Sequence, residues 1–124
     1  MFFVCIYSSL CSYSFFFATR RPESFVATRA QFARSLAALT VASYVLGIGD
    51  RHCDNFLMSQ RCGSLVGIDF GCAFGDGLAL SVPELIPFRF SPQFTRVLAP
   101  LHGRNSLARR SMVHALRALR AGAA

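Results

Sequence analysis

The sequence has 124 residues, enough for one domain or part of one, whereas a catalytic site between two lobes usually needs more chain. The formal net charge is +7, and all 13 basic residues are arginine, so the chain contains no lysine. A basic charge permits contacts with nucleic acid or phosphate but decides neither fold nor chemistry. The five cysteines lack paired C-x-x-C spacing, which argues against a zinc site and a disulfide framework and favours reduced thiols.

The N-terminal stretch differs in composition from the rest of the chain. Residues 1–18 carry no charge and are rich in Phe, Tyr and Ser. A signal peptide and a short membrane span are both alternatives, but the basic n-region is missing and hydroxyl groups dilute the apolar run. Because the composition changes abruptly near Arg20, we expect residues 1–21 to be a foreign or poorly ordered segment and residues 22–124 to form the domain.

Residues 22–46 predict a long helix. Pro22 suits the first turn of a helix, and Glu23 suits the positive end of its dipole. Apolar side chains recur at spacings that place them on one face: Phe25, Phe32, Leu36 and Leu39. The helix is expected to end where Gly47 and Gly49 release the backbone.

A polar loop and a hairpin follow this helix. The stretches "NFLMS" and "SLVGI" are typical of two short strands around "QRCG", with Gly63 in the turn. The segment "GIGDRHCDNF", residues 47–56, therefore becomes a loop held between a helix and a hairpin. Reactive groups are commonly mounted on such loops.

Three polar residues around the hairpin indicate phosphoryl transfer. Asp50 and Asn55 stand five residues apart, and Asp69 opens a D-F-G sequence directly after the second strand. In phosphoryl transfer one carboxylate orients the attacking hydroxyl, while an amide oxygen and a second carboxylate hold magnesium on the nucleotide phosphates. Each piece alone is weak, since D-x-x-x-x-N is often a turn and D-F-G is often a strand end. Their order around a hairpin makes the combination specific.

The order of the loop residues identifies a family. "GIGDRHCDNF" followed by "GIDFGCAFG" resembles the phosphatidylinositol 3-kinase-related protein kinases, in which the histidine follows the catalytic aspartate. "PESFVATRAQFA", "VPELIPFRFSPQF" and "SMVHALRALR" are similar to segments of the member that acts in DNA double-strand-break repair by end joining. The resemblance runs from Pro22 to Arg120. Most members carry a histidine where this chain has Gly67, a departure that favours the same branch.

The resemblance implies an α+β fold that is a partial protein-kinase-like C-terminal lobe, mostly helical, with a short β-hairpin between the catalytic loop and D-F-G. It implies catalytic roles for Asp50 and His52, magnesium ligation by Asn55 and Asp69, and structural roles in the catalytic loop for three further residues: Gly47, Gly49 and Arg51. From the residues alone, a hydrogen-bonding strut is the favoured interpretation of His52, and a structural ion-pair donor is an alternative for Arg51. Asp54 has no role that the resemblance assigns.

The activation segment implied by the resemblance carries an unusual charge. Its expected residues are Phe70, Gly71, Phe74, Pro83, Glu84, Pro87 and Phe88. Residues 72–88 contain two acids, Asp76 and Glu84, and no Arg or Lys, so an inositol phosphate headgroup would find no countercharge there. This pattern favours protein substrates over lipids, and the resemblance implies Ser or Thr followed by Gln.

Two helices are predicted after Pro92, in "QFTRVL" and "SLARRSMVHALRALR", separated by Pro100, Gly103 and Asn105. In the second helix four apolar positions are expected to face a core, and the arginines to lie outside. The apolar positions are Leu107, Met112 or Val113, Leu116 and Leu119; the arginines are Arg109, Arg110, Arg117 and Arg120. Without interleaved aromatic residues, a solvated face is favoured over nucleic-acid binding.

The resemblance also implies cofactors, partners and location. These are ATP with Mg²⁺, or Mn²⁺ as an alternative ion, Ser/Thr protein substrates, no membrane, and the nucleus. DNA and DNA-end-binding proteins would be bound through other parts of a parent chain. Because the chain has no lysine and no small lobe to cover ATP, we expect the isolated chain to be inactive. A noncatalytic remnant or interaction module and a lipid or small-molecule kinase fragment stay open as alternatives.

Overall fold

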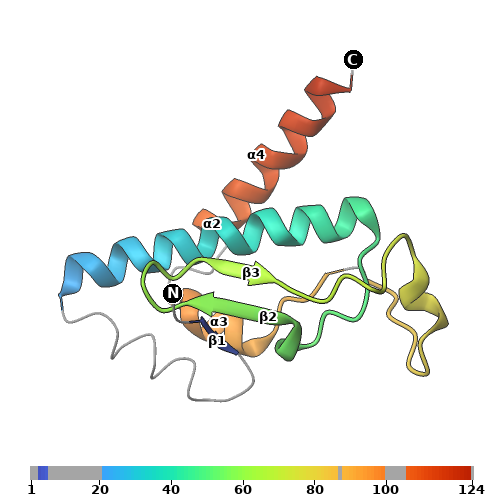
Figure 1. Cartoon of the computed structure of the whole chain (residues 1–124). Coiled ribbons are helices and arrows are strands. Elements are labelled where there is room, and N and C mark those ends of the chain that lie inside the picture. Colours follow the sequence, from blue (N-terminus) through green and yellow to red (C-terminus); the bar gives the residue numbers. More distant parts are fainter. Residues whose placement is uncertain (1–2, 6–20, 87, 100–105, 124) are drawn as a thin grey trace.

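The computed structural model describes residues 3–5, 21–86, 88–99 and 106–123 (Figure 1). Its helices are α2 (Pro22–Leu46), α3 (Pro92–Leu98) and α4 (Leu107–Gly122), with short 3-10 turns at Cys53–Asn55 and Asp76–Ala79. Its strands are β1 (Phe3–Cys5), β2 (Phe56–Ser59) and β3 (Leu65–Gly67). The prediction of a mostly helical chain with a hairpin directly before D-F-G is confirmed.

Helix α2 has the predicted bounds. Pro22 opens it, and Gly47 ends it in the left-handed conformation, with φ +59°, where its N–H donates to the carbonyl of Ser43. The predicted apolar face is also confirmed. Phe32 and Leu36 are buried in the core, while Phe25 and Leu39 pack partly buried against it.

The strands form one antiparallel sheet in the order β1-β2-β3. In the hairpin, Leu57 pairs with Val66 and Met58 with Leu65, and Gly63 occupies the turn with φ +72°. The sequence analysis did not predict the third strand, β1, which pairs with the other edge of β2. Residues 6–20 lie outside the described part of the chain, so the boundary near residue 21 stays a prediction.

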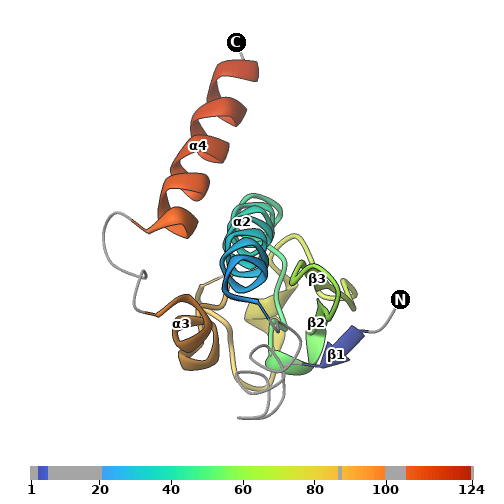
Figure 2. The same ribbon diagram turned by 90° about the vertical axis from the view of Figure 1, so that its left-hand side faces the viewer.

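The core lies where α2, α3 and the sheet meet (Figure 2). Phe94 of α3 is fully buried between two other aromatic rings. Its centroid is 6.0 Å from that of Phe32 on α2 and 5.3 Å from that of Phe56 on β2, both in edge-to-face arrangement. This cluster joins α2, α3 and β2, and Phe56 is also the last residue of the polar stretch 47–56.

Helix α4 projects from the body and contacts α2 (Figures 1 and 2). Its four predicted arginines are exposed, as expected. The expectation that its apolar positions face a core is wrong for Leu107, Leu116 and Leu119, which are 38%, 43% and 53% exposed. The physical reason is that α2 already packs its apolar face against the sheet and α3, so only Ala108 of α4 becomes buried.

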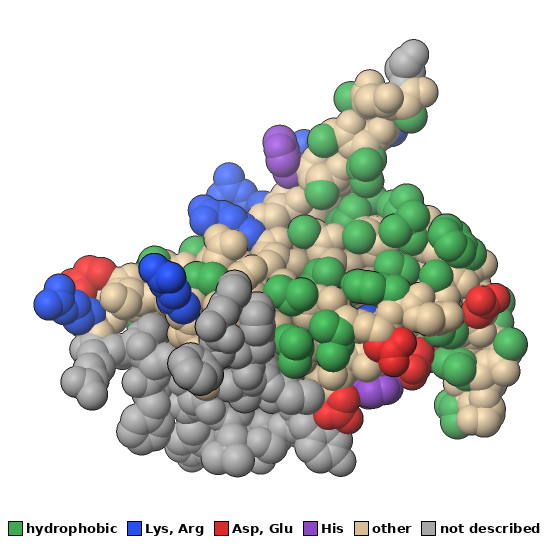
Figure 3. All heavy atoms as spheres, viewed as in Figure 1, with side chains coloured by type: hydrophobic (Ala, Val, Ile, Leu, Met, Phe, Trp, Pro, Cys, Tyr) green, Lys and Arg blue, Asp and Glu red, His purple; other side chains and the backbone are tan. Residues whose placement is uncertain are grey.

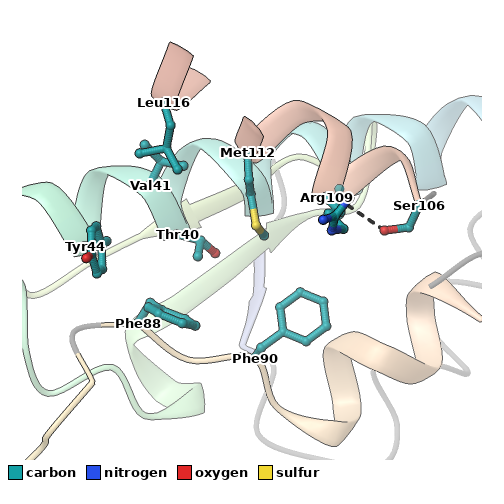
Figure 4. Close-up of a pocket in the computed structure, with 10 residues that line it drawn as sticks. Thr40, Val41, Tyr44, Phe88, Phe90, Ser106, Arg109, Met112 and Leu116 are labelled. Atoms are coloured by element: carbon teal, nitrogen blue, oxygen red, sulfur yellow. Dashed lines mark hydrogen bonds between the residues drawn. The ribbon is translucent and has the colours of Figure 1, made fainter. Parts of the chain in front are cut away.

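The junction of α2 and α4 carries an apolar groove. Figure 3 shows hydrophobic side chains gathered over this junction. In Figure 4, Val41 and Tyr44 of α2, Phe88 and Phe90, and Met112 of α4 line a cavity of about 540 Å³. The groove is separate from the polar loop. Among the described residues, no helix combines the length and the apolar character needed to cross a membrane.

Candidate functional site

Two glycines bring the polar loop against the segment that follows D-F-G. The Gly49 N–H donates to the carbonyl of Cys72 over 2.8 Å. A Cβ atom on Gly49 would lie 2.8 Å from Gly77 Cα, and one on Gly47 would lie 2.9 Å from the Gly75 nitrogen. Since both distances are shorter than real Cβ contacts, only glycine permits this approach.

Arg51 is the buried centre of the loop. Its side chain is among the largest fully buried ones of the described residues, with 2% exposed. The guanidinium donates to the carbonyls of Gly49 and Ile68, each over 2.9 Å, and also to the carbonyl of Asp69. It lies 5.2 Å from the centroid of the Phe70 ring. Arg51 thus ties the loop to the D-F-G backbone as a multiple hydrogen-bond donor.

The electrostatics around Arg51 are mixed. Burial lowers the pKa of Arg51, and the nearby carboxylates of Asp50, Asp69 and Glu84 oppose that shift. An arginine keeps its charge in such surroundings because its ordinary pKa lies so high. Three acidic side chains therefore share the field of one buried cation.

Asn55 is buried and bonded on several sides. Its side-chain Nδ2 donates to the backbone carbonyl of Asp50 over 2.7 Å, and its backbone carbonyl accepts the N–H of Ile68 over 3.0 Å. Because Nδ2 is committed to Asp50, the orientation of the amide is set and Oδ1 is the atom left to meet a cation.

Asp50 and Asp69 share an uncommon backbone conformation. Each has φ +54°, in the left-handed backbone region that residues other than glycine adopt less often. Asp69 Oδ1 accepts the N–H of Gly71 over 3.4 Å. Arg51 donates to the Asp69 carbonyl and Asn55 to the Asp50 carbonyl, so hydrogen bonds link the backbone of Asp50 and Asp69 to the loop.

His52 stands between two carboxylates. Its Nε2 lies 3.7 Å from Asp50 Oδ1, and its Nδ1 lies 3.7 Å from Asp54 Oδ2. Nδ1 also accepts the backbone N–H of Asp54 over 3.3 Å, which caps the 3-10 turn Cys53–Asn55. In the neutral imidazole this places the proton on Nε2, facing Asp50. Asp54 thus gains a partner that the sequence analysis did not assign.

The segment expected to be the activation segment lies beside the loop. Phe70 and Phe88 are exposed, and Phe74 is 85% exposed with φ +56°. The centroid of the Phe88 ring lies 6.4 Å from that of Tyr44. Gly71 and Pro83 are exposed, and Pro87 lies outside the described residues. Glu84 Oε2 accepts the N–H of Asp50 over 2.6 Å. Nothing local in the sequence signals this contact, because 34 residues separate its partners.

The donor set suits magnesium. In the described part of the chain, no three His, Cys, Asp or Glu side chains gather as a metal site. Mg²⁺, however, is usually bound by one or two protein oxygens together with substrate phosphates and waters. The Asn55 amide oxygen and the Asp69 carboxylate fit that requirement.

Cys72, beside the site, and Cys62, in the hairpin turn, are expected to differ in reactivity. Hydrogen bonding to Ser59 and Ser64 lowers the pKa of the exposed Cys62 thiol, whereas burial and the carboxylates of Asp76 and Asp50 raise the pKa of Cys72. Because the thiolate is the nucleophile, iodoacetamide at neutral pH should label Cys62 several times faster than Cys72. Peptide mass spectrometry measures both rates, with Cys62→Ser as the control. Faster labelling of Cys72 would contradict this assignment.

With this geometry in view, comparison with known proteins decides the family. The family model for "Phosphatidylinositol 3- and 4-kinase" matches residues 8–123. The chain belongs to this family. The resemblance seen in the loop and D-F-G sequences is confirmed over nearly the whole chain.

The relatives that the chain matches are named as protein kinases. The chain is 54% identical over 99 residues to the DNA-dependent protein kinase catalytic subunit of Dictyostelium discoideum, and 49% identical over 100 residues to that of Mus musculus. These matches cover 79% and 80% of this chain and 2% of each relative. The solved structure "Complete CtTel1 dimer with C2 symmetry" matches with a TM-score of 0.78 and 35% identity, over 88% of this chain and 4% of that chain.

Proposed function

We propose that this chain supplies the catalytic loop and the metal-binding D-F-G segment of a serine/threonine protein kinase of the DNA-dependent type. The observation that supports the proposal is the pair of hydrogen bonds that Arg51 donates to the Asp69 carbonyl and Asn55 to the Asp50 carbonyl. Family membership and the likeness to DNA-dependent protein kinase catalytic subunits support it. We also propose that the kinase-domain part of the chain is residues 22–124 and that residues 1–21 do not belong to it.

Each residue then has a defined task. Asp50 accepts the hydrogen bond of the attacking Ser or Thr hydroxyl and so orients it toward the phosphate. His52 Nε2 faces the same carboxylate, and we assign it the role of donor to the transferred phosphate. Asn55 and Asp69 would hold Mg²⁺, which would neutralise part of the negative charge on the ATP phosphates. Gly47, Gly49 and Arg51 fix the loop backbone on which these side chains stand.

The substrate class follows from the segment after D-F-G. Residues 72–86 expose the apolar side chains of Leu78, Val82 and Leu85, and Glu84 is committed to the Asp50 amide. No cation among residues 72–88 can balance a phosphorylated inositol headgroup. A peptide hydroxyl needs no such charge, so we propose Ser/Thr proteins as substrates and phosphoinositides as nonsubstrates.

The remaining assignments rest on the family alone. We propose a nuclear role in double-strand-break repair, with DNA and DNA-end-binding proteins bound by other parts of a parent chain. A protein kinase also pairs its nucleotide phosphates through a lysine, and this sequence has none. We therefore propose that the 124-residue chain alone does not phosphorylate a Ser-Gln peptide.

A metal titration of the chain tests the site. Mn²⁺ is paramagnetic and broadens nearby NMR resonances even when it binds weakly. Without ATP, which would itself chelate the metal, added MnCl₂ should first broaden the amide resonances of Asn55 and Asp69 and leave those of α3 sharp. The Asp69→Asn variant should need at least about tenfold more Mn²⁺ for the same broadening, because it loses a charged ligand.

A matched control removes an acid from the following segment. Asp76→Asn should titrate as the unchanged chain does, because Asp76 is not among the proposed ligands. Uniform broadening of all resonances, or equal loss in Asp69→Asn and Asp76→Asn, would contradict the proposed metal site.

A further inference from the structure

The segment after D-F-G is bound along the polar loop by backbone hydrogen bonds. The Phe74 N–H donates to the carbonyl of Leu46, and the Gly75 N–H to the carbonyl of Gly47, each over 3.0 Å. The Gly49 to Cys72 bond continues the series in the opposite direction. The two segments therefore lie at backbone contact, with no side chain between them.

Glu84 ends this contact with a side chain. Its backbone N–H donates to the carbonyl of Gly77 over 3.0 Å, which turns the chain back toward the loop. Its Oε2 then accepts the N–H of Asp50 over 2.6 Å in a partly buried position. A short bond from an amide to an ionised carboxylate belongs to the stronger class of protein hydrogen bonds.

Asp50 has a backbone that requires support. Its φ of +54° is unfavourable for a residue with a Cβ atom and persists only when neighbours hold it. Asn55 Nδ2 holds the Asp50 carbonyl, and Glu84 holds the Asp50 amide. One support comes from the loop itself, and the other comes from the segment after D-F-G.

We propose that Glu84 is a positioning residue that orients Asp50 through its backbone amide. The consequence is that the orientation of Asp50 depends on the folded position of residues 72–84. When that segment leaves the loop, Asp50 loses the acceptor of its amide and Gly49 loses its bond to Cys72, while the side chains of Asn55 and Arg51 keep their partners. The inference deepens the proposed function, because it gives Glu84 a role only through Asp50.

Hydrogen exchange of the Asp50 amide, measured by NMR on the full chain, tests the proposal. In the unchanged chain this amide should resonate far downfield and exchange slowly. Glu84→Ala should increase its exchange rate at least about tenfold and move its resonance upfield, because the charged acceptor is gone. Glu84→Gln keeps an uncharged acceptor of the same shape and should give an intermediate rate and shift. Asp76→Asn, which removes a charge from the same segment, should leave the amide unchanged.

Urea titration serves as the control for global unfolding. Glu84→Gln should unfold at the same urea concentration as the unchanged chain. The proposal is overturned if the Asp50 amide of Glu84→Gln keeps its original shift and exchange rate, or if Asp76→Asn disturbs it equally. The manganese titration keeps the two proposals apart. A response of the Asp50 amide without selective broadening at Asn55 and Asp69 would refute the proposed site and leave the Glu84 contact standing.

Discussion

Replacing Arg51 with alanine should unfold much of the chain. Arg51 is buried, and its guanidinium donates to three backbone carbonyls, those of Gly49, Ile68 and Asp69. The bond to the Gly49 carbonyl is buried, so its loss costs about 1–3 kcal/mol, and the lost side chain adds a cavity. We expect a loss of at least about 3 kcal/mol in the free energy of unfolding, a large share of the stability of a small domain.

Urea unfolding followed by circular dichroism measures this loss. Arg61→Ala is the matched control, because Arg61 lies exposed in the hairpin turn and its removal should change the free energy of unfolding by at most about 0.5 kcal/mol. Arg51→Lys keeps the charge but not the planar fork of donors, so it should fall between the two. If Arg51→Ala and Arg61→Ala unfold at the same urea concentration, the role given to Arg51 is wrong.

Phe94→Ala should be comparably destabilising for a different reason. Phe94 has no exposed surface and packs edge-to-face on Phe32 and Phe56, so it joins α3 to α2 and β2. Truncating a buried phenylalanine costs about 3–5 kcal/mol through lost burial and the cavity left behind. Since Phe56 borders the polar loop, the chain should also lose protection of its loop amides.

The control for Phe94 is Phe74→Ala, because Phe74 is 85% exposed and both residues have the same side chain. The Phe74 variant should unfold within about 0.5 kcal/mol of the unchanged chain. Phe94→Leu, which keeps most of the volume, should cost less than about 1.5 kcal/mol. Equal unfolding midpoints for Phe94→Ala and Phe74→Ala would show that the aromatic cluster does not hold the fold together.

The sequence predicted those parts of the fold that depend on local signals. The bounds of α2 follow from Pro22 and Gly47, and the hairpin follows from apolar strands around Gly63, because these residues favour particular backbone angles wherever they occur. The candidate site residues were also visible, since Asp50, Asn55 and Asp69 appear in a chemically meaningful order along the chain.

The rest depends on contacts between distant parts of the chain. Strand β1 comes from an uncharged stretch without alternation, so only its pairing with β2 reveals it. The pattern of α4 shows that one face is apolar but not what covers that face, and Leu116 and Leu119 are exposed. The bond between Glu84 and Asp50 spans 34 residues and follows from the packing of two loops.

The left-handed backbone at Asp50 and Asp69 implies a trade between stability and chemistry. At both positions glycine would adopt the observed φ without steric cost, whereas an aspartate pays on the order of 1 kcal/mol. The chain therefore carries an aspartate at two positions, 50 and 69, where the backbone conformation favours glycine. A search for more stable variants would therefore select glycine at the two positions where the proposed reaction needs an acid, so thermostability and phosphoryl transfer are opposed at the same two residues.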